Sequence, residues 1–136
     1  MDLMPDDLRA RLLANGAAAT ETDHIPLAKF FDPSGAATWL ITEMMPHEPD
    51  ILFGLCDLGM GTPELGYVSL AELQAVRGRL GLGIERDLYF GAHYPLSVYA
   101  EAARRAGAIT ENEEALARAA SALRERFGTE LPPQGG

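Results

Sequence analysis

The chain has 136 residues, a formal net charge of −9 at pH 7, 47% hydrophobic residues and 23% charged residues. These values are typical of a soluble globular domain that is long enough to bury a hydrophobic core. They exclude a membrane-spanning segment, because no apolar run approaches the roughly 20 residues that a bilayer requires, and the single cysteine, Cys56, excludes an internal disulfide.

The start of the chain, residues 1–7, has neither the basic residues nor the apolar stretch of a secretory signal peptide. A single cysteine is also typical of proteins that fold in a reducing compartment. Together these features predict a cytoplasmic protein.

The first part of the chain predicts a helix followed by a β-hairpin. Residues 5–15 combine a proline suited to the first helical turn with leucines at helical spacing, and Gly16 ends this segment. Residues 27–31 predict a strand, and the sequence Asp32-Pro33-Ser34-Gly35 predicts a tight turn. The chain then returns through a second strand, residues 38–44, antiparallel to the first.

This second strand contributes the only tryptophan to the predicted core. Residues 38–44 are rich in β-branched and aromatic side chains, and successive side chains of a strand point to opposite faces. Strict alternation places Glu43 on the same face as Trp39 and Ile41, and Met44 on the opposite face. We expect Trp39 to be buried, because Ile41 shares its face.

The next strand is predicted to lie in the middle of the sheet. Residues 51–57 are apolar on both faces, which is typical of a strand that is covered on both sides. Gly54, at its centre, predicts a β-bulge or the close approach of another element. Cys56 lies in the same apolar strand, where a thiol usually serves as an unreactive packing residue.

A short strand and a helix follow. Residues 65–68 predict the strand, and Ser69 and Glu72 have the spacing of a capping box that begins the helix. Apolar residues at helical spacing continue this helix up to Gly81. Residues 84–90 then alternate apolar and charged side chains, which predicts a half-exposed strand near an edge of the sheet.

The chain continues with a helix that begins after Pro95 and ends at Gly107. Glu101 and Arg105 are four residues apart on this helix, so we expect an outward-facing ion pair between them.

The last helix follows a second capping box, formed by Thr110 and Glu113, and ends at Gly128. Residues 129–136 predict a disordered tail. Because short links join the successive strands, neighbouring strands must be antiparallel. The order of elements therefore predicts a single α+β domain over residues 1–128, with helices packed on a mainly antiparallel sheet of four to five strands.

Acidic residues dominate one long stretch of the sequence. No lysine or arginine occurs between Lys29 and Arg77. Seven acids lie in this stretch: Asp32, Glu43, Glu48, Asp50, Asp57, Glu64 and Glu72. A negative face of this kind disfavours binding to nucleic-acid phosphates and favours cations or basic proteins. A charged surface that only keeps the protein soluble is the alternative.

Glu43 and Asp57 end two strands of the predicted sheet, so we expect both at its rim, beside the glycine-containing loop that leads to Glu64. His93, next to Tyr94 and just before a helix, is the best placed of the histidines to join a site. We predict that these four residues form a rim that binds a ligand or partner: Glu43, Asp57, Glu64 and His93. The loop glycines do not predict a phosphate site, because a strand and not a helix follows them.

The same carboxylates are candidates for binding a divalent cation. If a metal binds, Asp57 and Glu64 are the expected ligands, with Glu43, Asp50 or His47 as further donors. The spacing of these residues matches no recognised calcium-binding loop, and neighbouring loops often carry two or three carboxylates without a metal. We therefore predict no cofactor.

Three segments carry a resemblance to a known family. They are residues 38–43, 53–59 and 63–70. From about Leu8 to about Ile109 the chain resembles the bacterial domain-of-unknown-function family 2958, and the helix after Thr110 lies outside the resemblance. The resemblance implies a bacterial origin and a setting among plasmid and other mobile-element genes, near DNA-processing or antirestriction functions. It implies no activity, cofactor or catalytic residue.

The function that the sequence favours is a non-enzymatic accessory or interaction module that binds a basic protein through the acidic rim. The first alternative is a small metal-assisted hydrolase that uses the rim carboxylates with His93. The second is an acidic mimic of nucleic acid, which requires the acids to converge on one face at a density close to that of DNA phosphates.

Overall fold

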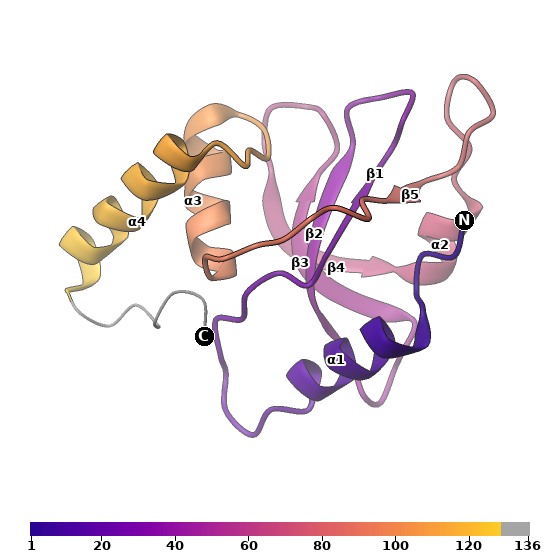
Figure 1. The fold of residues 1–136 in the computed structure, drawn as a ribbon, viewed down its shortest axis with the longest axis horizontal. Helices are drawn as coiled ribbons and strands as arrows, with labels where there is room; N and C mark the ends of the chain where they lie inside the picture. Colours follow the sequence, from indigo (N-terminus) through magenta and orange to yellow (C-terminus); the bar gives the residue numbers. More distant parts are fainter. Residues whose placement is uncertain (129–136) are drawn as a thin grey trace.

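The computed structural model describes residues 1–128, in which a central β-sheet lies between two pairs of helices (Figure 1). Within these residues the sheet has five strands in the order β4-β3-β2-β1-β5, and every neighbouring pair is antiparallel. The elements are α1 (Asp6–Gly16), β1 (Ala28–Phe31), β2 (Thr38–Met44), β3 (Ile51–Asp57), β4 (Glu64–Ser69), α2 (Leu70–Ala75), β5 (Glu85–Arg86), α3 (Leu96–Ala106) and α4 (Glu113–Phe127). The predicted α+β class and antiparallel sheet are confirmed.

The sheet separates two hydrophobic cores. On one face, α1 and α2 pack over a cluster that contains Phe30, Trp39 and Ile41, so the prediction that Trp39 is buried is confirmed. On the other face, α3 packs over Leu40 and Leu55, and α4 packs on the outside of α3. Both faces of the central strands are therefore covered, which accounts for their nearly continuous apolar sequence.

The regular alternation of β2 is interrupted by a β-bulge. Gly54 pairs with Ile41 and Phe53 pairs with Glu43, so Thr42 is an extra residue in the ladder. As a consequence Met44 joins the core under α1 together with Ile41, and Glu43 turns to the face that α3 covers. The predicted faces of Glu43 and Met44 are therefore wrong. The prediction that Gly54 marks a bulge or the close approach of another element is confirmed, since the bulge lies opposite Gly54 and the β2 backbone approaches it closely.

Cys56 is partly buried against the core under α1, in agreement with its predicted packing role. Burial raises the pKa of its thiol, which keeps the sulfur protonated and unreactive at neutral pH.

The helix after β4 is shorter than its sequence suggests. Ser69 caps α2 as predicted, because its hydroxyl accepts a hydrogen bond from the Glu72 N–H at 3.1 Å. The helix ends at Ala75 and not at Gly81, since Arg77 forms a bridge with Gly83 across a loop. A Cβ atom on Gly78 would lie 2.1 Å from the Ser34 hydroxyl oxygen, so tight packing on the β1–β2 turn holds this loop outside the helix.

Two further boundaries differ from the prediction. The strand predicted over residues 84–90 is reduced to Glu85–Arg86, which lies at the edge beside β1 as expected. The cap of α4 is Asn112 and not Thr110, since the Asn112 side chain accepts a hydrogen bond from the Ala115 N–H at 2.9 Å.

The prediction of a disordered tail concerns residues 129–136, which lie outside the described residues. Within residues 1–128 no helix has both the length and the apolarity needed to cross a bilayer.

Candidate binding cleft

The structure separates the predicted site residues. Glu43 pairs with Phe53 near one end of β3, whereas Asp57 pairs with Thr38 at the other end. Glu64 is opposite Cys56, at the same end as Asp57. The predicted common rim of Glu43 with Asp57 and Glu64 is therefore wrong.

His93 lies just before α3, is exposed, and forms a hydrogen bond with Glu113 at the start of α4. Its ring also lies beside that of Tyr94, with the ring centroids 5.4 Å apart. Whether any of the four predicted residues binds a ligand or a partner stays a prediction.

Asp57 has a structural role in the loop region. It is 3% exposed, and its carboxylate accepts hydrogen bonds from the N–H groups of Gly59 at 2.8 Å and Ile109 at 2.9 Å. It thus ties the β3–β4 loop to the connection between α3 and α4, whereas Glu64 is exposed. In the part of the chain that the structure describes, no group of three or more His, Cys, Asp or Glu is placed to hold a metal ion.

Replacing Asp57 with asparagine is expected to lower the free energy of unfolding by about 1–2 kcal/mol, because an amide group would face one of the two backbone donors. Glu64→Gln, at the neighbouring exposed position, should change it by less than about 0.5 kcal/mol. Urea unfolding of both variants measures the difference. Equal stability of the two variants would contradict the structural role of Asp57.

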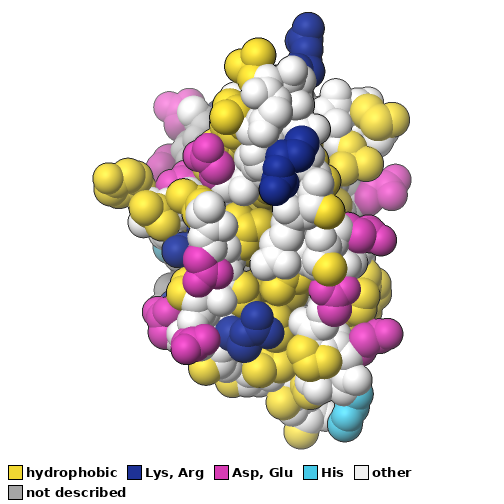
Figure 2. Space-filling view, turned by 90° about the vertical axis from the view of Figure 1, so that its right-hand side faces the viewer, with side chains coloured by type: hydrophobic (Ala, Val, Ile, Leu, Met, Phe, Trp, Pro, Cys, Tyr) yellow, Lys and Arg dark blue, Asp and Glu magenta, His cyan; other side chains and the backbone are white. Residues whose placement is uncertain are grey.

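The acidic residues between Lys29 and Arg77 do not converge on one face. Glu43, Glu48 and Asp50 lie around the β2–β3 connection, whereas Asp32, Asp57 and Glu64 lie around the loops at the opposite end of the sheet. Figure 2 shows the side of the molecule that carries β5 and α2, with Asp and Glu along both margins and Lys and Arg between them. The described acids of this stretch are therefore divided between the two ends of the sheet.

A cleft of about 670 Å³ opens on the α3 face of the sheet. Glu43 from β2 and the segment of residues 21–24 line it, and Phe53 and Leu65 from β3 and β4 supply apolar surface. The cleft therefore combines acidic groups with an apolar wall, an arrangement typical of a binding site.

The segment that walls the cleft is fastened to the start of α3. The Asp23 carboxylate accepts hydrogen bonds from the Ser97 N–H at 3.0 Å and from the Ser97 hydroxyl. The Leu96 N–H donates a hydrogen bond to the His24 carbonyl oxygen at 2.9 Å. These bonds use the free amide groups at the helix N-terminus, so they fix the segment and leave the helix end occupied.

Glu43 has the most unusual environment in the cleft. Burial raises the pKa of its carboxyl group, the charge of His24 lowers it, and the charge of Glu21 raises it. Among the described residues no hydrogen bond contributes to the pKa of Glu43. A carboxylate that is partly withdrawn from water and lacks a donor suits a bound cation or a basic side chain.

Sequence reasoning found Glu43 but missed the rest of this cleft. Glu21, Asp23 and His24 lie in a polar connection, which gives no signal beyond its charge. Their positions depend on the bonds to Ser97, which is 74 residues away from Asp23 in the sequence. Such a long-range pairing cannot be inferred from one sequence.

Comparison with family models found a match to one described as a protein of unknown function, DUF2958, over residues 3–110. The match includes α1, the whole sheet and α3, and it ends before α4, which agrees with the extent of the predicted resemblance. Comparison with curated proteins and with solved structures found no match. Since the family model matches most of the chain, the chain belongs to the DUF2958 family.

Proposed function

We propose that the protein is a non-enzymatic interaction module that holds a basic segment of a partner protein in the cleft around Glu43. The observation that carries this proposal is the Glu43 carboxylate, which is partly buried, lines the cleft together with Glu21, and has no hydrogen-bond donor among residues 1–128. We further propose, from the setting that the family resemblance implies, that the module acts in the cytoplasm on a basic protein of a mobile-element or DNA-processing system.

The chemistry of the cleft supports a basic partner. An arginine or lysine would place a permanent positive charge beside Glu43 and Glu21, while its aliphatic stem would lie against Phe53 and Leu65. Holding an unpaired carboxylate in a partly buried place costs stability. A cost of this kind is typical of functional sites, where stability is given up for binding.

The rival functions have less support. A metal-assisted hydrolase needs converging ligands, whereas Asp57 uses both carboxylate oxygens on backbone groups and Glu43 lies at the opposite end of the sheet. A nucleic-acid mimic needs its acids on one face at high density, and the structure divides them between two ends.

Glu43→Gln is expected to weaken partner binding at least about tenfold while leaving the melting temperature unchanged or slightly higher, because it removes a partly buried charge. The wild-type protein and the variant would serve as baits in a lysate of the native host. A captured protein would then be purified, and its affinity for each bait measured at low salt and at about 1 M salt, where charge pairs are screened.

Glu72→Gln is the matched control, since Glu72 is an exposed acid on α2, which packs on the other face of the sheet. It should bind as the wild type does. The proposal is wrong if Glu43→Gln and Glu72→Gln bind equally, or if binding is insensitive to salt.

A further inference from the structure

The two edges of the sheet are protected to very different degrees. β5 forms one edge with only two residues, both charged. β4 forms the other edge with six residues, Glu64–Ser69, which pair with β3 without a register shift and include no proline, lysine or arginine. Within residues 1–128 no strand pairs with the outer side of β4. Natural proteins block sheet edges with short strands, charges, prolines or bulges, so β4 is the edge that can accept another strand.

The backbone groups that β4 presents to this open side can be identified. The Leu70 N–H donates a hydrogen bond to the Asp50 carbonyl oxygen, which makes these two residues a hydrogen-bonded pair. Hydrogen-bonded and non-hydrogen-bonded pairs alternate along an antiparallel ladder. Leu65, Tyr67 and Ser69 therefore belong to non-hydrogen-bonded pairs, and their N–H and C=O groups point away from β3.

The open edge adjoins the cleft. Glu43, Phe53 and Tyr67 are aligned across β2, β3 and β4, and the ring centroids of Phe53 and Tyr67 are 5.1 Å apart. Leu65, which lines the cleft, is 50% exposed and Tyr67 is 67% exposed. The sheet thus offers an uncovered apolar strip directly between its free edge and the acidic cleft.

We propose that the basic segment of the partner binds as an extended strand that adds to β4 and extends the sheet. This inference rests on the proposed function, and it specifies the form in which the partner binds. Main-chain hydrogen bonds to Leu65 and Tyr67 would supply affinity, and alternate side chains would supply specificity. The segment would carry arginine or lysine at alternate positions and β-branched residues between them.

Charge complementarity favours a basic segment as the strand that binds at the β4 edge. Strands are about 4.8 Å apart, so the added strand would lie roughly 14 Å from Glu43 along the row. Basic side chains that extend over the Tyr67 ring would shorten this distance to within the screening length and gain a cation–π contact. A second copy of this chain, with its acidic cleft and net charge of −9, lacks that complementarity.

The test uses two capped peptides of roughly eight residues, long enough to span β4. One alternates lysine with valine, and the other alternates threonine with valine. Their affinities for the wild type, Tyr67→Pro, Tyr67→Ala and Glu43→Gln would be measured by fluorescence anisotropy, and amide exchange at Leu65 and Tyr67 by NMR.

The lysine peptide should bind the wild type and slow amide exchange at Leu65 and Tyr67. Tyr67→Pro removes an N–H that points away from β3, so it should weaken binding at least about tenfold more than Tyr67→Ala, which removes the same side chain and keeps that donor. If Tyr67→Pro does not fold, strand addition is tested by amide exchange at Leu65 and Tyr67 in the wild type alone.

The outcomes separate the two proposals. Salt-sensitive binding that is weakened by Glu43→Gln but leaves the Leu65 and Tyr67 amides unprotected would refute strand addition. The same result would support the proposal that the cleft binds a basic segment. Equal binding of the threonine peptide, with the Leu65 and Tyr67 amides protected, would support strand addition and refute the acidic cleft, whereas no binding of either peptide would refute both. Protection of the same amides in the free protein, with dimers in sedimentation, would show that a second copy occupies the edge and overturn the proposal.

Discussion

Replacing Gly54 with alanine is expected to lower the free energy of unfolding by about 3 kcal/mol. A Cβ atom at this position would lie 1.9 Å from the Leu40 carbonyl oxygen and 2.9 Å from the Ile41 Cα atom. Both are backbone atoms of the neighbouring strand, so no side-chain rotation can relieve the overlap. Urea unfolding followed by the fluorescence of Trp39, the single tryptophan, measures the loss.

Gly66 provides a matched control, because it pairs directly with Gly54 in the β3–β4 ladder. A Cβ atom on Gly66 would meet nothing within 4 Å, so Gly66→Ala should change stability by less than about 1 kcal/mol, with a small gain expected from the lower entropy of the unfolded chain. Similar losses in the two variants would show that the bulge does not bring the backbones of β2 and β3 into such close contact.

The elements that could be predicted from the sequence are those with strong local signals. Pro95 and Gly107 flank α3, and Gly107 has the positive φ of 77° that a helix-ending glycine supplies. The end of α2 could not be predicted in this way. Its apolar spacing continues through Val76 and Leu80, but packing of the following loop on the β1–β2 turn ends the helix and leaves Leu80 76% exposed.

The candidate site was less predictable, for two physical reasons. Consecutive antiparallel strands finish at opposite ends of a sheet, so the predicted topology itself already separated Glu43 from Asp57. The bulge at Thr42 then moved Glu43 to the α3 face, and a one-residue insertion of this kind leaves no trace in the periodicity of residues 38–44. Gly54 was the only sign of it.

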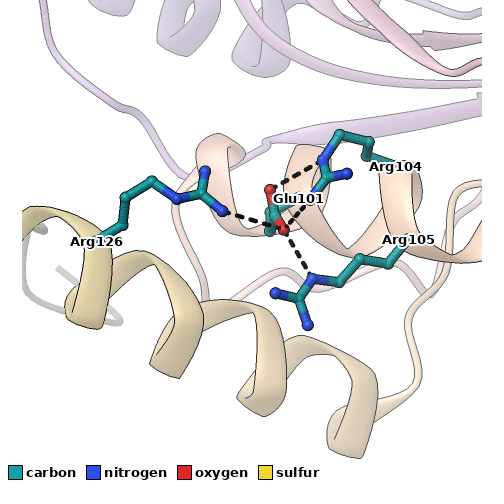
Figure 3. A network of polar contacts seen from close by, with 4 residues as sticks. All are labelled: Glu101, Arg104, Arg105 and Arg126. Carbon is teal, nitrogen blue, oxygen red and sulfur yellow. Dashed lines mark hydrogen bonds and ion pairs between the residues drawn. The ribbon is translucent and has the colours of Figure 1, made fainter.

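Glu101 illustrates the same limit on α3. Its predicted pair with Arg105 is present, with the Arg105 Nε donating to the carboxylate at 2.7 Å. The prediction that the pair faces outward is wrong, because the Glu101 carboxylate is buried. Two further arginines contact it, Arg104 on the same helix and Arg126 on α4 (Figure 3). Since Arg126 lies on a helix beyond the family match, its approach to Glu101 could not be predicted from spacing along α3.

Glu101→Gln is expected to lower the free energy of unfolding at pH 7 by about 2 kcal/mol, after allowance for the solvent around the exposed guanidinium groups. The hydrogen bond from Arg104, opposed by burial and assisted by Arg105, lowers the pKa of this carboxyl group from 4.5 to about 2. A lowered pKa stabilises the fold above the ordinary value of the group, and this contribution is lost as the pH falls through the lowered value. The stability difference between variant and wild type should therefore shrink between pH 4.5 and about pH 2.

Glu114→Gln is the control for this effect, because Glu114 faces Arg118 at the same four-residue spacing, at 3.8 Å, while its side chain is 85% exposed. An exposed pair of this kind contributes less than about 0.5 kcal/mol, so this variant should unfold almost as the wild type does at every pH. Thermal unfolding of both variants across the acidic range makes the comparison. A Glu101 variant with a pH-independent loss would show that the side chain stabilises α3 by packing alone, whereas a loss that disappears in acid would assign the stabilisation to the ionised carboxylate that holds α3 and α4 together.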